Sequence, residues 1–136
     1  MDRDTFKIMH SSIMMCFQCI EFDLKRIYSG MSSDDFDDCM DMLETSNFGE
    51  VLNRLRRLDN SDNNSYISDS DYELLDRIRE MRNYWCHQCY LDFVYIQNDQ
   101  NRENKFQKIA RRLDSEYNRV LKLHHNLQSF YFDHFE

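Results

Sequence analysis

The chain has 136 residues, no proline and only two glycines, and it carries a formal net charge of -8. This length suits one domain that buries a core without disulfides or metals, and the shortage of helix-breaking residues predicts an all-α fold. The negative charge disfavours general binding of nucleic acid, which normally needs a basic surface.

The first half of the chain contains three stretches that predict helices. Apolar side chains recur at helical spacing from about residue 5 to 28, and Gly30 is a typical residue just past the end of a helix. Residues 32–45 predict a short helix despite a run of aspartates. Its expected inward residues are Phe36, Met40 and Leu43. A further helix is expected to begin at Asn47, where Glu50 completes a capping box.

The second half contains a loop and two long predicted helices. Residues 59–65 have the composition of a loop. Ser68 or Ser70 is expected to cap the third long helix, which we predict to continue to about Gln97. The last helix is predicted over residues 101–130. The simplest arrangement that buries all these apolar stripes is a single domain, an up-and-down bundle of four to five helices.

The third long helix changes character along its length. At about 100° per residue, one set of apolar side chains shares a face, which we expect to point into the bundle. This set comprises Leu74, Ile78, Met81, Trp85 and Cys89. His87 lies nearly opposite that face. From Tyr84 to Ile96 the predicted helix is apolar on all sides, which is typical of a helix covered on both faces. A homodimer about a two-fold axis is the commonest way to provide the second cover, and it would place His87 in or beside the interface.

Arg82 is the other notable residue of this helix, because it falls at the edge of the apolar arc. By ideal geometry it is roughly 140° around the helix from His87 and about 7.5 Å along it. The two side chains can therefore converge only through the long stem of Arg82, or across a dimer. The alternative interpretation gives Arg82 an ion pair with Glu80, Asp76 or another helix, and makes His87 an interface histidine.

The motif Arg82-Asn83 followed by His87 resembles the signature of the HEPN superfamily of helical domains. That signature is an arginine, four to six residues and a histidine, and a polar residue often follows the arginine. Residues 21–26 and 48–51 are similar to the end of the family's first helix and the start of its second. The resemblance covers most of residues 5–97, and it implies a helical bundle that dimerises through the motif helix.

Many members of this superfamily are metal-independent endoribonucleases of toxin–antitoxin, abortive-infection or other defence systems, and others are binding modules without activity. The resemblance implies Arg82 and His87 as catalytic residues, Asn83 as a supporting residue, RNA as substrate and no cofactor. One subgroup has a tyrosine two residues after the histidine, where a nucleotidyltransferase antitoxin modifies it. Here Cys89 takes that place and Tyr90 follows. Tyr90 is therefore the candidate for modification or substrate contact, and an antitoxin of this type or another inhibitor is a candidate partner.

The chemistry of such cleavage suits these residue types. The ribose 2′-hydroxyl attacks the adjacent phosphate and gives a 2′,3′-cyclic phosphate and a free 5′-hydroxyl. The reaction needs a base, an acid and positive charge near the phosphate, and histidine, with a reference pKa of ~6.5, can act as either acid or base. The acidic composition slightly favours the alternative of an inactive HEPN-like dimer that binds a nucleotide or a protein partner, whereas the presence of both motif residues favours the enzyme. A plain helical adaptor is a third interpretation.

Other groups of residues give weaker signals. Two Cys-x-x-Cys pairs, Cys16–Cys19 and Cys86–Cys89, resemble a zinc pattern. Both lie within predicted helices rather than tight turns, so we expect small buried apolar residues and no metal. Three histidines near the C-terminus, His124, His125 and His134, fit helix surface and tail. The aspartates of residues 34–41 lack the pattern of a calcium loop.

The remaining expectations concern location and local charge. The sequence opens without a basic stretch followed by an apolar run, and no apolar segment approaches the length of a membrane span. With an odd number of cysteines in helical patterns, these features predict a cytoplasmic protein that does not contact membranes.

Six arginines lie in the middle of the chain: Arg54, Arg56, Arg57, Arg77, Arg79 and Arg82. A local basic cleft on an acidic body is therefore consistent with the sequence.

Overall fold

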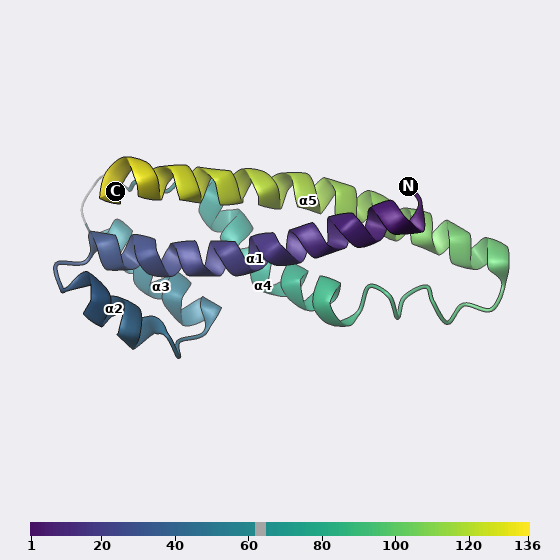
Figure 1. The fold of residues 1–136 in the computed structure, drawn as a ribbon, viewed down its shortest axis with the longest axis horizontal. Helices are drawn as coiled ribbons and strands as arrows, with labels where there is room; N and C mark the ends of the chain where they lie inside the picture. The colour runs from purple at the N-terminus through teal and green to yellow at the C-terminus, as the bar shows by residue number, and fades with distance from the viewer. Residues whose placement is uncertain (62–64) are drawn as a thin grey trace.

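The computed structural model confirms the all-α prediction (Figure 1). It describes residues 1–61 and 65–136, and across these ranges it contains five helices and no strand. The helices are α1 (Arg3–Met31), α2 (Phe36–Leu43), α3 (Phe48–Asp59), α4 (Asp69–His87) and α5 (Asp99–Phe135). Part of the predicted loop, residues 62–64, lies outside the described residues.

Successive helices alternate in direction, so α1 and α5 run parallel side by side and α4 runs against both (Figure 1). At one end of the bundle, Gln107 of α5 hydrogen-bonds to the amino group of Met1 at 3.3 Å. At the other end, Phe135 packs directly over Gly30, at the C-terminal end of α1. Helix α1 lies at the centre of the bundle, because it contacts each of the other four helices.

The core is built from the predicted apolar stripes. All five residues expected on the inner face of the third long helix are buried: Leu74, Ile78, Met81, Trp85 and Cys89. In the short helix α2, Leu43 is buried, whereas Phe36 and Met40 are only partly buried. Within the described residues, no helix is long and apolar enough to cross a membrane.

The helix starts follow the predicted capping signals. The side-chain oxygen of Asn47 accepts a hydrogen bond from the backbone N–H of Glu50 at 2.9 Å. At the start of α4 the cap is Ser68, whose hydroxyl accepts from the backbone N–H of Asp71 at 3.1 Å. These bonds satisfy N–H groups that have no partner within the first turn of a helix.

Asp59, predicted to begin a loop, is instead the buried last residue of α3. Its carboxylate accepts a hydrogen bond from the hydroxyl of Tyr72 at 2.6 Å and three more from residues 65–67. Burial alone would raise the pKa of Asp59, but these hydrogen bonds outweigh it and hold the pKa below its usual value. One carboxylate therefore ties the segment that leads into α4 to the end of α3.

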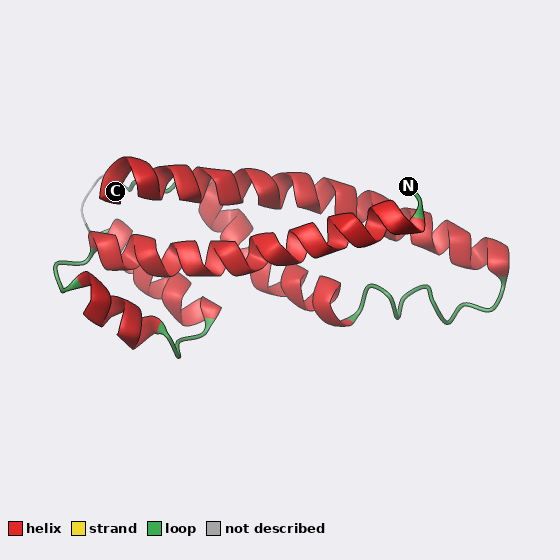
Figure 2. Cartoon of the chain, viewed as in Figure 1, coloured by secondary structure: helices red, strands yellow, loops and turns green. Residues whose placement is uncertain are grey.

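The predicted end of the third long helix was wrong. Helix α4 ends at His87, not near Gln97, and irregular turns follow until α5 begins (Figure 2). The carboxylate of Asp92 accepts hydrogen bonds from the amide of Gln88 and the hydroxyl of Tyr84, both at 2.9 Å. These bonds lower the pKa of Asp92 and stabilise the turn.

Packing gives the second reason for this early end. Phe93 is buried and lies edge-on against Phe106 of α5 and Phe6 of α1, at centroid distances of 5.3 and 6.3 Å. The segment after His87 therefore packs against the core instead of continuing the helix. The apolar residues expected to surround a continuous helix are carried by turns instead, and three of them are at least half exposed: Leu91, Val94 and Tyr95.

Candidate functional site

Arg82 lies on the side of α4 that faces α1. Its Nη1 is 3.1 Å from Oε2 of Glu21, and both side chains are partly buried, with exposed fractions of 31% and 29%. The ion pair joins residues 61 positions apart in the sequence. This contact matches the alternative interpretation, in which Arg82 pairs with an acidic residue of another helix.

His87 is the last residue of α4, and its side chain is exposed. Within the described ranges it makes no hydrogen bond or ion pair, and none joins it to Arg82. Asn83 is exposed as well. Arg82 therefore reaches toward α1, whereas His87 and Asn83 face outward from the bundle.

Trp85, between the motif residues, fixes the end of α4 in the core. Its ring is fully buried, and its Nε1 donates a hydrogen bond to Glu116 of α5 at 3.2 Å. Its backbone carbonyl lies 2.6 Å from Nε2 of His10 on α1. The last turn of α4 is thereby held to both neighbouring helices, which gives the exposed motif residues a rigid support.

A network of polar and aromatic groups extends from Glu116 to the turn after α4. Arg112 donates to the second carboxylate oxygen of Glu116 at 2.6 Å, and its guanidinium lies 3.8 Å from the ring centroid of Tyr84. Burial and the hydrogen bond to Asp92 raise the pKa of Tyr84 to about 12. Tyr84 is thus a neutral hydrogen-bond donor at physiological pH, with a structural role.

Tyr90 packs against α1. Its ring lies edge-on to Phe6 and His10, at centroid distances of 5.7 and 5.4 Å, and burial raises the pKa of its hydroxyl. His10, which sequence reasoning missed, thus contacts both the backbone of Trp85 and the ring of Tyr90. Nothing in the local sequence distinguishes His10 from an ordinary helical residue, since its role depends on the packing of α4 against α1.

The cysteines do not form a metal cluster. All five are free thiols, and no group of three or more potential ligands comes together among the described residues. Of the two Cys-x-x-Cys pairs, Cys16 and Cys89 are buried as expected, whereas Cys19 is only partly buried and Cys86 is exposed. Burial raises the pKa of the Cys89 thiol to about 11, so it is protonated at neutral pH.

His124 is not on the solvated helix surface as predicted. Its side chain is only 12% exposed and its Nδ1 lies 3.5 Å from a carboxylate oxygen of Asp23, a contact too long for a strong hydrogen bond. The other oxygen of Asp23 pairs with Arg26 at 3.0 Å. Burial nevertheless raises the pKa of Asp23, because it outweighs the attraction of these two partners.

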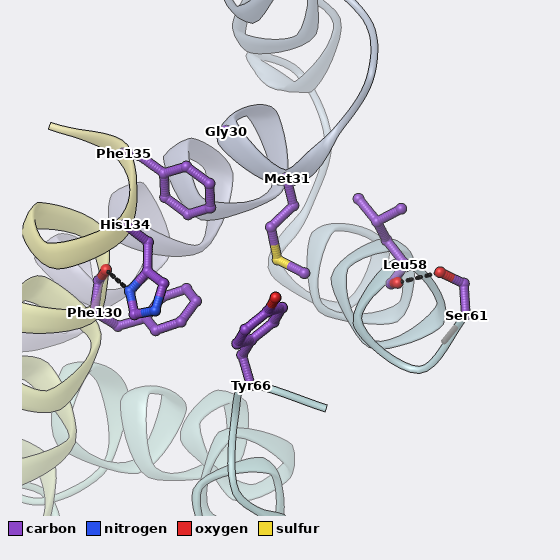
Figure 3. A pocket seen from close by; sticks show the side chains of 8 residues that line it. All are labelled: Gly30, Met31, Leu58, Ser61, Tyr66, Phe130, His134 and Phe135. Atoms are coloured by element: carbon purple, nitrogen blue, oxygen red, sulfur yellow. Dashed lines mark hydrogen bonds between the residues drawn. The ribbon is translucent and has the colours of Figure 1, made fainter. Parts of the chain in front are cut away.

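A cavity of about 400 Å³ lies beside the C-terminal ends of α1, α3 and α5 (Figure 3). Its lining residues are Gly30, Met31, Leu58, Ser61, Tyr66, Phe130, His134 and Phe135. His134 stacks on Phe130, at a centroid distance of 4.3 Å, and its Nδ1 is 3.0 Å from that residue's carbonyl. None of the described residues that line it is an arginine, a lysine or an acidic residue, and phosphodiester chemistry requires such charge.

Comparison with known proteins does not assign this chain to a family. No protein-family model matches it, and neither a curated protein nor a solved structure matches it.

Proposed function

We propose that two copies of this chain form a metal-independent endoribonuclease of the HEPN type, a toxin or defence protein that acts in the cytoplasm. The observation that carries the proposal is the exposed imidazole of His87, which bonds to none of the described residues and lies five residues after Arg82, on a helix end that Trp85 anchors. Catalytic groups need such a support, because a small displacement costs much of the rate.

In the proposed reaction, His87 removes the proton from the ribose 2′-hydroxyl or supplies one to the leaving 5′-oxygen. Arg82 neutralises the charge that develops on the phosphate, and Asn83 donates a hydrogen bond to a phosphate oxygen or orients His87. Phosphorus exchanges its bond to the 5′-oxygen for a bond to the 2′-oxygen. The products are a 2′,3′-cyclic phosphate and a 5′-hydroxyl.

The directions of the Arg82 and His87 side chains support an active site that is shared between two chains. Arg82 lies toward α1 and His87 outward, so a phosphate held between them is reached more directly across a dimer. In the turns that follow His87, the exposed apolar side chains of Leu91, Val94 and Tyr95 offer surface that a second copy would bury. Two protomers would then contribute two histidines and two arginines to one cleft.

A second candidate function is a HEPN-like dimer without catalytic activity, which binds a nucleotide or a protein partner. The specific observation in its favour is the ion pair between Arg82 and Glu21, because it occupies the guanidinium that the reaction needs. In the catalytic proposal this surface pair is weak enough to open, since partly exposed ion pairs contribute little stability.

The proposed partner of the active form is a nucleotidyltransferase antitoxin, with Tyr90 as its target, or another inhibitor.

The test is incubation of the purified chain with total cellular RNA in excess EDTA. We expect cleavage fragments that end in 2′,3′-cyclic phosphate and begin with a 5′-hydroxyl. Total RNA is the appropriate substrate because it includes structured and unstructured targets. Intact RNA, together with tight binding of a nucleotide, would favour the second candidate.

A further inference from the structure

A groove between α4 and α5 is lined mainly by charged side chains. Its volume is about 220 Å³. Its lining residues are Arg77, Glu80, Met81, Arg112, Glu116 and Arg119. Three guanidinium groups thus face two carboxylates, in a protein with a net charge of -8.

The charges of the groove are not all compensated. Glu116 is buried and is paired with Arg112 at 2.6 Å, so these two groups largely cancel. Arg77 and Arg119 are exposed, and within the described residues neither makes an ion pair or a hydrogen bond. The exposed part of the groove therefore has two available guanidinium groups against the one carboxylate of Glu80.

The groove also lies on the His87 side of α4. By ideal helix geometry Arg77 is about 80° around the helix from His87, whereas Arg82 is about 140° away in the other direction. Between Arg77 and His87, a distance of about 15 Å along the helix, lies Tyr84, which the guanidinium of Arg112 covers. The free guanidinium of Arg77 thus lies on the His87 side of α4, around the helix from His87 in the direction opposite to Arg82.

We infer that this groove binds phosphate groups, and that its ligand is the backbone of a single-stranded RNA whose chain continues toward His87. The inference rests on the proposed function and adds the substrate-binding surface to it. Arg77 and Arg119 supply free N–H donors that match phosphate oxygens in pairs. Arg112, fixed by Glu116, holds its position between them and the motif. The groove gives an acidic protein the local positive charge that RNA binding requires.

The test compares two double variants in the non-cleaving His87→Ala chain. Arg77→Gln/Arg119→Gln removes the free guanidinium groups of the groove. Arg79→Gln/Arg111→Gln is the matched control, because it removes two exposed arginines from the same two helices outside the groove. Binding of a short fluorescent single-stranded RNA is measured by anisotropy at several salt concentrations, and ATP is titrated in parallel.

We expect the groove variant to lose about tenfold or more in RNA affinity, and the control variant to change affinity less than about threefold. In the groove variant the slope of log affinity against log salt concentration should also fall by about 1 to 2.

Equal losses of RNA affinity in both variants, or no binding of RNA, would overturn the inference. ATP binding that depends on the groove, without RNA binding, would assign the groove to a free nucleotide and overturn the RNA assignment. RNA that binds through the groove but is not cut by the unmodified chain would contradict only the proposed function. Cleavage of RNA by the unmodified chain, together with equal RNA affinity of the two double variants, would contradict only the groove.

Discussion

His87→Ala is expected to lower the rate of RNA cleavage by about 100- to 10,000-fold, the usual contribution of a general acid or base. The same substitution should change the free energy of unfolding by less than about 0.5 kcal/mol, because an exposed side chain without partners supports little structure. A large loss of rate without a loss of stability is characteristic of a catalytic residue.

The measurement is the initial rate of RNA cleavage under single-turnover conditions, with thermal unfolding of the same samples. His125→Ala is the control, because His125 is an exposed histidine of α5 away from the motif. It should keep the full rate. If the His87→Ala and His125→Ala chains cut RNA equally fast, His87 is not the acid or base of the reaction.

Trp85→Ala is expected to lower the free energy of unfolding by about 4 kcal/mol, within the range for removing a buried aromatic side chain. Trp85 is fully buried; its ring packs edge-on against Tyr84 at a centroid distance of 4.8 Å and lies tilted to Phe6 at 6.5 Å. The substitution also removes the N–H that bonds to Glu116, so a buried carboxylate loses one of its two partners.

Denaturant unfolding followed by circular dichroism measures this effect, since the variant lacks the chain's only tryptophan as a fluorescent probe. The control is Tyr95→Ala, which removes an aromatic side chain that is 78% exposed and should change stability by less than about 0.5 kcal/mol. Similar stability in the two variants would contradict the role of Trp85 as the anchor of the motif helix.

The helices themselves could be predicted from the sequence, because their apolar residues follow helical spacing and their starts carry capping residues such as Asn47 and Ser68. The end of α4 could not. The apolar pattern continues past His87 without a glycine or proline, so nothing local marks a stop. The turn depends on the bonds to Asp92 and on the packing of Phe93 in the core, which are set by the fold.

The candidate site, too, could be predicted only in part from the sequence. The spacing of Arg82 and His87 is visible in the sequence, and so is the outward direction of His87. The partner of Arg82 is not, because Glu21 lies on another helix 61 positions away. The groove is also hidden, since arginines of α4 and α5 become neighbours only when the two helices pack together.

The central claim is that two chains share one active site, and mixed dimers test it most directly. Arg82→Ala and His87→Ala chains, each inactive alone, are co-expressed with different tags, and the mixed dimer is isolated by both tags. If Arg82 of one chain acts with His87 of its partner, the mixed dimer retains one intact pair and should cleave RNA far faster than either parent. If each chain forms its own site, every site carries a defect, and a mixed dimer as inactive as its parents would contradict the shared site.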